Sequence, residues 1–224
     1  MSHVVSESAE TPVQEAKLHR SVFWRFMQWL LTPFFLLWAR TDAIGIENID
    51  DTKGGLLLLN HESYLDPLVA AFRLRRPVSF LARDGLFDVP MIGWILRRTY
   101  VVPVSQTAFR GSSVRQAVDR MHEGFLVGIF PEGERTIGGM VRFNRGFLSL
   151  VRRADLPIYP VGIVGAGRLM PMGAAWIRPG QITVVYGEPL TEAERAQLQE
   201  KGKDEQLAEM VRQRVADCMT KSGH

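Results

Sequence analysis

Two side chains that could move a proton follow a short apolar run in this 224-residue sequence. The run 56–59 is Leu-Leu-Leu-Leu, and after it come Asn60, His61 and, five residues beyond the histidine, Asp66. A neutral imidazole can accept a hydroxyl proton at about pH 7 if a carboxylate fixes its tautomer and stabilises the imidazolium. Asp66, directly before Pro67, could also cap a helix that starts there. The pair predicts a general base, although a lone histidine and aspartate are more often structural.

A second polar loop follows the apolar run 126–130. Its sequence Pro-Glu-Gly-Glu-Arg places Glu132, Gly133 and Arg135 directly after an expected strand. Gly133 would let backbone N–H groups approach an anion, and Arg135 would supply a positive charge. Taken alone, the loop is better explained as a surface turn with an ion pair.

Short apolar runs alternate with amphipathic stretches in the rest of the chain, which is typical of α/β folds. Helices are expected at about 112–123 and 204–220, and another helical stretch ends near Arg98. Because several strand candidates are unbroken apolar runs, the sequence predicts one α/β domain with a mostly parallel central sheet flanked by helices. The seven expected strands are 43–47, 56–59, 78–82, 100–104, 126–130, 158–164 and 182–186.

The expected site lies where three of these strands end, since ligand groups in open parallel sheets gather beyond the carboxyl ends of the strands. Two of the loops carry His61 and Glu132, and the third, after 100–104, carries Gln106 with Arg110 four residues on. Spacing alone leaves open whether the three loops meet.

An apolar, tryptophan-rich segment lies near the start of the chain. We expect a disordered leader at 1–17, a membrane-anchoring helix at 18–40 and the main domain at 41–224. The segment 22–39 contains three tryptophans, and as a helix it would reach ~27 Å, slightly short of a ~30 Å hydrocarbon core. Tryptophan and arginine favour the membrane interface, so an interfacial anchor is preferred over a tilted span or a core helix. No secretory cleavage site follows the segment.

The charge of the chain is uneven. The net charge is +3, but residues 73–153 hold 14 arginines, no lysine and six acidic residues. Such a basic middle suggests an acidic partner, for which phosphate esters, a nucleotide-bearing thioester, an anionic membrane and nucleic acid are candidates. No nucleic-acid motif, metal cluster, Gly-x-Ser-x-Gly elbow or phosphate loop accompanies it, and one cysteine excludes an internal disulfide. We therefore expect no nucleic acid and no metal.

Taken together, the two polar loops form a specific pattern. H-x-x-x-x-D after a buried strand, followed some seventy residues later by F-P-E-G-x-R, resembles the glycerolipid acyltransferase family, and the resemblance covers about 38–190. Three further blocks agree with it: a lead-in at 45–49, Leu-Phe-x-x-Pro-x-x-Gly-Trp at 86–94, and a proline-bearing block at 156–161.

This resemblance implies transfer of a fatty acyl group from acyl-CoA or acyl-carrier protein to the free hydroxyl of a lysophospholipid. His61 would deprotonate the hydroxyl and Asp66 would orient His61, while Glu132, Gly133 and Arg135 would hold the acceptor's polar head. The acceptor implied first is 1-acyl-sn-glycerol-3-phosphate, giving phosphatidic acid, with no further cofactor, at the cytoplasmic face of a membrane. A lyso-lipid acceptor without phosphate and a non-catalytic lipid-binding relative are the alternatives.

The sequence departs from the family pattern at several positions. Gln106 stands where the family usually has an arginine that holds the acceptor phosphate, and Arg110 could replace that arginine. A lysine-x-glutamate pair of the same block reads Arg83, Asp84 and Gly85, and Glu134 stands where threonine is usual. The catalytic pair is therefore better supported than the identity of the acceptor.

Overall fold

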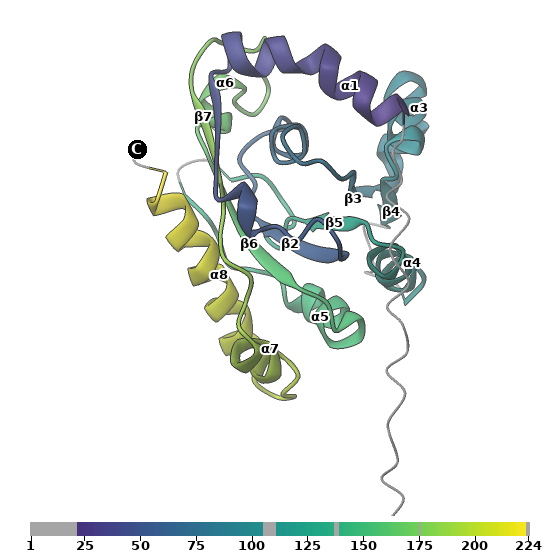
Figure 1. The fold of residues 1–224 in the computed structure, drawn as a ribbon, viewed down its shortest axis with the longest axis vertical. Helices are drawn as coiled ribbons and strands as arrows, with labels where there is room; N and C mark the ends of the chain where they lie inside the picture. Colours follow the sequence, from purple (N-terminus) through teal and green to yellow (C-terminus); the bar gives the residue numbers. More distant parts are fainter. Residues whose placement is uncertain (1–21, 105–110, 137–138, 175, 223–224) are drawn as a thin grey trace, which may run out of the picture.

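A seven-stranded sheet organises the part of the chain that the structure describes. The structure is a computed structural model, and it describes residues 22–104, 111–136, 139–174 and 176–222. The strands stand in the order β1-β7-β6-β2-β5-β3-β4 (Figure 1). In chain order they are β1 (Thr41–Ile44), β2 (Gly55–Leu59), β3 (Val78–Arg83), β4 (Val102–Val104), β5 (Leu126–Ile129), β6 (Ile158–Val164) and β7 (Ile182–Tyr186).

The sheet is mostly parallel, as the sequence predicts. β2 pairs in parallel with β5 on one side and with β6 on the other, and β3 continues the parallel arrangement next to β5. The exception is the pair β6 and β7, which is antiparallel, so β7 and its parallel neighbour β1 run against the other strands. All seven expected strands are present, and their ends differ from the expected ones by at most three residues.

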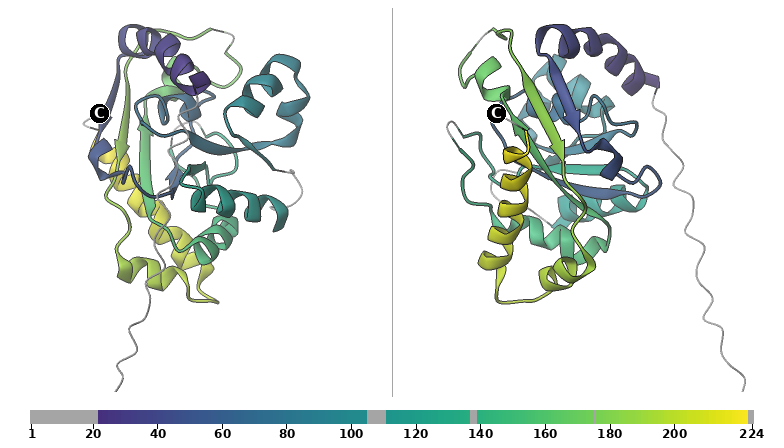
Figure 2. Two further views of the ribbon diagram at one scale, coloured as in Figure 1. Left: turned by 45° about the vertical axis from the view of Figure 1, so that its right-hand side comes forward. Right: turned by 60° about the vertical axis from the view of Figure 1, so that its left-hand side comes forward.

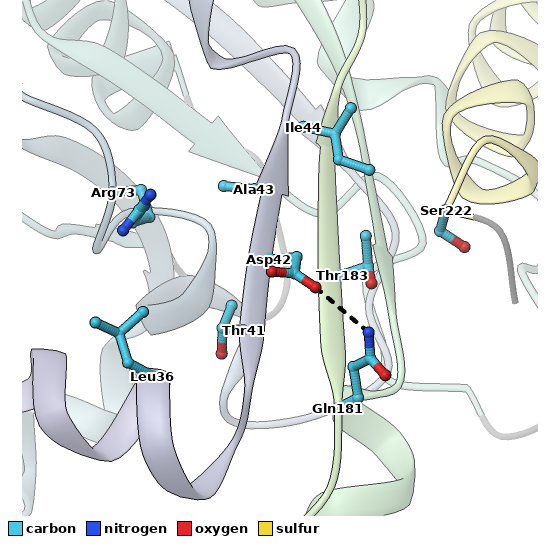
Figure 3. Close-up of a pocket in the computed structure, with 9 residues that line it drawn as sticks. All are labelled: Leu36, Thr41, Asp42, Ala43, Ile44, Arg73, Gln181, Thr183 and Ser222. Atoms are coloured by element: carbon cyan, nitrogen blue, oxygen red, sulfur yellow. Dashed lines mark hydrogen bonds between the residues drawn. The ribbon is translucent and has the colours of Figure 1, made fainter.

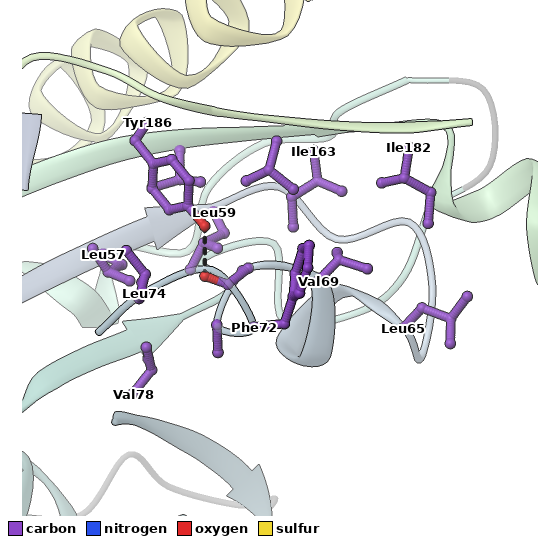
Figure 4. Close-up of a cluster of buried hydrophobic side chains, with 14 of the residues drawn as sticks. Leu57, Leu59, Leu65, Val69, Phe72, Leu74, Val78, Ile163, Ile182 and Tyr186 are labelled. Atoms are coloured by element: carbon purple, nitrogen blue, oxygen red, sulfur yellow. Dashed lines mark hydrogen bonds between the residues drawn. The ribbon is translucent and has the colours of Figure 1, made fainter. Parts of the chain in front are cut away.

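Strand β2 divides the hydrophobic interior into two cores. Leu57 and Leu59 point into the first core, and Leu56 and Leu58 into the second, because successive side chains of a strand face opposite sides of the sheet. The first core, shown in part in Figure 4, also receives residues of α1 (Val22–Pro33), α2 (Asp66–Val69) and α6 (Ala166–Leu169). The second is covered by α4 (Gly111–His122), α5 (Leu148–Ala154), α7 (Glu192–Leu198) and α8 (Asp204–Thr220).

The helices with a regular apolar stripe lie where the sequence predicts them. Helix α8 has the predicted bounds, α4 differs by one residue at each end, and the expected stretch near Arg98 is α3 (Pro90–Arg98). Two helices of seven residues, α5 and α7, are additional. The start of α7 carries a capping box, in which Thr191 accepts from the backbone N–H of Glu194 while the Glu194 side chain accepts from that of Thr191.

The tryptophan-rich segment lies across one end of the molecule (Figures 1 and 2). It consists of α1 and a π-helical turn, η1 (Phe34–Trp38), rather than one regular α-helix, and the change occurs at Pro33, which has no N–H to donate. The side-chain amide of Gln28 in α1 donates hydrogen bonds to the carbonyls of Phe72 and Leu74, in the turn after α2. Within the described residues, no helix combines the length and the apolar character that crossing a bilayer requires.

Candidate active site

The first polar loop brings His61 and Asp66 together. Nδ1 of His61 lies 2.7 Å from Oδ2 of Asp66, and the Asp66 side chain is fully buried at the start of α2. The same oxygen accepts hydrogen bonds from the backbone N–H groups of Glu62 and Ser63, at 2.7 and 2.8 Å. Asp66 therefore shapes the loop and orients the imidazole. The expectation that it caps the helix is wrong, because the N-cap of α2 is Leu65 and the Asp66 side chain accepts from residues that precede the helix.

The contact with Asp66 determines which nitrogen of His61 is available. A carboxylate at Nδ1 stabilises the tautomer in which Nδ1 carries the proton, and Nε2 is then a proton acceptor. Among the described residues, Nε2 has no hydrogen-bond partner, and the side chain is 19% exposed. The imidazole is thus partly open to a small group such as a hydroxyl.

Aromatic stacking and the sheet hold this loop in place. The His61 ring stacks on Phe130 with a centroid distance of 4.1 Å, and Phe130 stacks in turn on Phe80 of β3. The residue before the histidine is fixed by two bonds, because the buried Asn60 amide donates to the carbonyl of Ile163 and accepts from its N–H, at 2.8 and 2.7 Å. The position of His61 is therefore set by β2 and its two neighbours, β5 and β6.

Glu132 connects the second loop to the first. Its Oε1 accepts the backbone N–H of His61 at 2.7 Å, and its Oε2 accepts from Thr136 Oγ1 at 2.8 Å and from the N–H of Val141 at 3.0 Å. A further bond joins the loops, from the N–H of Thr136 to the carbonyl of His61 at 3.0 Å. The side chain is 4% exposed, so both carboxylate oxygens are engaged inside the protein. The family resemblance implies that Glu132 holds the acceptor's head. Its hydrogen bonds indicate another role, which is to position His61.

Gly133 and Arg135 lie on the outer side of the same loop. Gly133 has a φ of 76°, which favours glycine, and a Cβ there would lie 2.8 Å from Nδ2 of Asn144. The guanidinium of Arg135 lies 3.5 Å from the centre of the Tyr64 ring. Arg83, at the end of β3, donates to the carbonyl of Gly133 at 3.3 Å. In the described part of the chain, neither arginine has a carboxylate within ion-pair distance, so two unneutralised cations border the loop.

Two of the predicted site residues, Gln106 and Arg110, lie outside the described residues. The described residues include no group of side chains suited to hold a metal ion. A surface cavity lies elsewhere, at the edge strand β1 and its neighbour β7, and it contains neither His61 nor Asp66 (Figure 3). Its lining is Leu36, Thr41, Asp42, Ala43, Ile44, Arg73, Gln181, Thr183 and Ser222.

The carboxyl group of Glu62, the residue after His61, lowers the stability of the protein when it is ionised. Burial raises its pKa, and the nearby charge of Asp66 adds to the effect, while the N–H of Gly167, 3.2 Å from Oε2, opposes it. A carboxyl whose pKa is raised in the folded protein begins to lower stability as the pH rises through the unfolded pKa. The loss is complete above the folded pKa and absent below the unfolded one.

We therefore expect Glu62→Gln to raise the melting temperature at about pH 7, and this gain to disappear below about pH 4, where carboxyl groups are protonated. Thermal denaturation of both proteins across this range measures the difference. Glu134→Gln, at an exposed position of the second loop, serves as the control. A Glu62→Gln protein that is less stable at every pH would show that the bond to Gly167 outweighs the cost of burial.

Comparison with known proteins identifies the family. A family profile described as acyltransferase matches residues 40–164, which is more than half of the chain. The chain is 32% identical over 192 residues to a 1-acyl-sn-glycerol-3-phosphate acyltransferase of Chlamydomonas reinhardtii, covering 84% of this chain and 54% of that protein. A protein of the same name from Bacillus subtilis is 26% identical, with coverage of 78% and 86%.

A solved structure supports the fold. The 1-acyl-sn-glycerophosphate acyltransferase of Thermotoga maritima superposes with a TM-score of 0.70 at 21% identity, covering 88% of this chain and 79% of that one. The chain spans about half the length of the first curated relatives, 54% of the Chlamydomonas protein and 46% of one from Brassica napus. The family match and the 32% identity confirm the resemblance seen in the sequence: this protein belongs to the acyltransferase family.

Proposed function

We propose that this protein transfers a fatty acyl group from a thioester, acyl-CoA or acyl-carrier protein, to the free hydroxyl of a lysophospholipid. The acceptor we favour is 1-acyl-sn-glycerol-3-phosphate, which would give phosphatidic acid. The observation that carries the proposal is the pair His61–Asp66, at 2.7 Å, with Nε2 of His61 left as a proton acceptor. The names of the Chlamydomonas and Bacillus relatives support the choice of acceptor.

In the proposed reaction, Nε2 of His61 removes the proton of the acceptor hydroxyl as its oxygen attacks the thioester carbonyl. The carboxylate of Asp66 stabilises the imidazolium that forms. The tetrahedral intermediate then collapses, the carbon–sulfur bond breaks, and the thiolate takes the proton from His61. The histidine returns to its first state, and no acyl group is attached to the protein. The intact pair argues against a lipid-binding relative without catalysis.

The acceptor phosphate would be held by arginines of the second loop and of β3. Arg135 is fixed against Tyr64, three residues after His61, and Arg83 is held by the carbonyl of Gly133. Both guanidinium groups could form charge-assisted bonds to a phosphate, and they would offset the absence of an arginine at Gln106. The same glutamine keeps one alternative open, an acceptor whose head carries no phosphate, such as an aminolipid or glycolipid.

The proposed place of reaction is the cytoplasmic face of a membrane, to which α1 and η1 attach the protein peripherally or monotopically. Trp29, Leu30 and Leu37 expose apolar side chains from this segment, and Arg25 and Arg40 are exposed with them. This combination favours the headgroup region of a bilayer. The partners we expect are the membrane, the acyl donor and the lysophospholipid, and no nucleic acid.

The experiment that tests the proposal is turnover of acyl thioesters by the purified protein with a panel of lyso-lipids. Release of the free thiol and formation of the diacyl product are measured together, with both acyl-CoA and acyl-carrier protein as donors. Product formed with 1-acyl-sn-glycerol-3-phosphate in preference to lyso-lipids without a terminal phosphate supports the proposal. Preference for an unphosphorylated acceptor contradicts the assigned substrate, and no product with any acceptor contradicts the assigned reaction.

Arg135→Ala should raise the KM for 1-acyl-sn-glycerol-3-phosphate about tenfold or more and change kcat less. A hydrogen bond to a charged group contributes about 1.5–3 kcal/mol, and a contact present in both ground and transition states affects binding rather than the chemical step. Steady-state kinetics with phosphorylated and unphosphorylated acceptors measures the effect. Arg115→Ala, an exposed arginine of α4, is the matched control. An equal change for both acceptor classes would place Arg135 away from the phosphate.

A further inference from the structure

Tyr64 is an exposed aromatic residue in the turn that separates His61 from Asp66. It is 57% exposed, whereas its neighbours Ser63 and Leu65 are buried. Two hydrogen bonds close the turn, because the N–H of Asp66 donates to the carbonyl of Ser63 at 3.3 Å and Oδ2 of Asp66 accepts the N–H of Ser63 at 2.8 Å. The carboxylate that orients His61 therefore also fixes the turn from which the Tyr64 side chain extends.

The guanidinium of Arg135 covers the ring of Tyr64. Its central carbon lies 3.5 Å from the ring centroid, and carbon atoms in contact are about 3.5–4.0 Å apart. This separation fits two flat groups that lie face to face, because an N–H pointed at the ring would hold the central carbon farther away. In such a stack the N–H groups lie in the guanidinium plane, so they point past the ring and remain available to a ligand.

The main chain next to Arg135 is bound to the His61 loop as well. The following residue, Thr136, donates its N–H to the carbonyl of His61 at 3.0 Å, and its hydroxyl donates to Oε2 of Glu132 at 2.8 Å. Oε1 of the same carboxylate accepts the N–H of His61 at 2.7 Å. Arg135 is therefore connected to the first loop twice, by its backbone through Thr136 and by its side chain through Tyr64.

An aromatic face is a suitable support for an arginine that has to bind an anion. In the part of the chain that the structure describes, no carboxylate lies within ion-pair distance of Arg135, and the Tyr64 ring holds its guanidinium instead. A carboxylate would occupy the N–H groups that a phosphate needs, whereas a ring face leaves them free. The stack also restricts the rotamers of a long side chain before the ligand arrives, which lowers the entropy lost on binding.

We propose that Tyr64 is a positioning residue, which holds Arg135 in a fixed place relative to His61 and so makes the protein select acceptors that carry a phosphate near the reacting hydroxyl. The inference deepens the proposed function and rests on it. In 1-acyl-sn-glycerol-3-phosphate, adjacent carbons carry the free hydroxyl and the phosphate. A cation fixed to the His61 loop can therefore meet the phosphate while the hydroxyl lies at Nε2 of His61.

The test is steady-state kinetics of Tyr64→Leu and Tyr64→Phe with a short-chain, monomeric 1-acyl-sn-glycerol-3-phosphate and with the corresponding 1-acylglycerol. Leucine keeps an apolar side chain but has no aromatic face, so the KM for the phosphorylated acceptor should rise about two- to fivefold while kcat changes less. That fold-change corresponds to about 0.5–1 kcal/mol, the contribution of an exposed cation–aromatic contact. Phenylalanine keeps the ring and should restore the wild-type KM. Neither variant should change the KM for the 1-acylglycerol.

A double variant shows whether Tyr64 acts through Arg135. If it does, adding Tyr64→Leu to Arg135→Ala should raise the KM for the phosphorylated acceptor no further. Trp176→Leu, which removes an exposed aromatic ring outside the loops of His61 and Glu132, is the matched control and should leave every KM unchanged. The melting temperature of each variant verifies that it is folded.

Several results would overturn the inference and leave the proposed acyl transfer intact. An unchanged KM for the phosphorylated acceptor in Tyr64→Leu would mean that the stack does not position Arg135 for the phosphate, and a lowered KM would mean that it holds Arg135 away. An equal rise for both acceptors would assign Tyr64 a structural role, and additive effects with Arg135→Ala would assign it a contact of its own. A wild type without preference for the phosphorylated acceptor contradicts the proposed acceptor, and this inference with it.

Discussion

Replacement of His61 by alanine is expected to lower kcat for acyl transfer by about 10²–10⁴-fold while the KM for both substrates changes little. A positioned general base contributes about this factor. Among the described residues, His61 is the histidine whose ring nitrogen contacts Asp66. Alanine leaves Asp66 with its two backbone donors, the N–H groups of Glu62 and Ser63, so the loop keeps most of its bonds. The measurement is steady-state turnover together with the melting temperature.

His122→Ala provides the matched control for this variant. His122 is an exposed histidine at the end of α4, outside the loops of His61 and Glu132, and its loss should leave turnover and stability unchanged. The His61 ring stacks on Phe130, so its loss should cost a small amount of stability as well. Near-normal turnover by a folded His61→Ala protein would falsify the assignment of the general base.

Much of the fold could be predicted because its central strands are short, unbroken runs of apolar residues. The run Leu56–Leu59 is buried on both faces, and four apolar residues between glycine and asparagine have the length of a buried strand rather than of a helix. The reversed direction of β7 could not be predicted. The run 182–186 is equally apolar in either direction, so the run itself does not show that β7 lies antiparallel to β6. Helix α5 has only seven residues, too few to show a period.

The contact between His61 and Asp66 was accessible from the sequence because their five-residue spacing is local. His61 and Asp66 belong to one loop and one helix start, so their meeting requires only that turn. The contact of Glu132 with His61 is different, since it depends on β2 and β5 being neighbours in the sheet, 71 residues apart in the chain. The sequence does not show whether a carboxylate that follows a strand points to solvent or into the protein. The stacking of Phe130 on His61 was missed for the same reason.

Glu132→Gln is the second variant from which we expect a large effect. Its Oε1 accepts from the N–H of His61, and its Oε2 accepts from Thr136 and Val141, so every partner is a donor. An amide has one accepting oxygen and one donating NH₂ group, so the backbone N–H of either His61 or Val141 loses its acceptor. An unsatisfied donor of this kind costs about 1–3 kcal/mol of stability.

The loss should extend to the reaction, because the Glu132 carboxylate links the backbone of His61 to Thr136 and Val141, and its replacement disturbs this connection. A displacement of about 1 Å at a catalytic group can lower the rate by about 10²-fold, so we expect kcat to fall to that degree while KM for the acceptor changes little. Glu134→Gln, which alters an exposed carboxylate in the same loop, is the control and should leave both values unchanged. The contrasting result is a Glu132→Gln protein with normal stability and a raised KM. That result would mean that Glu132 contacts the acceptor's head directly, as the family resemblance implies, and that its bonds to the two loops yield when the acceptor binds.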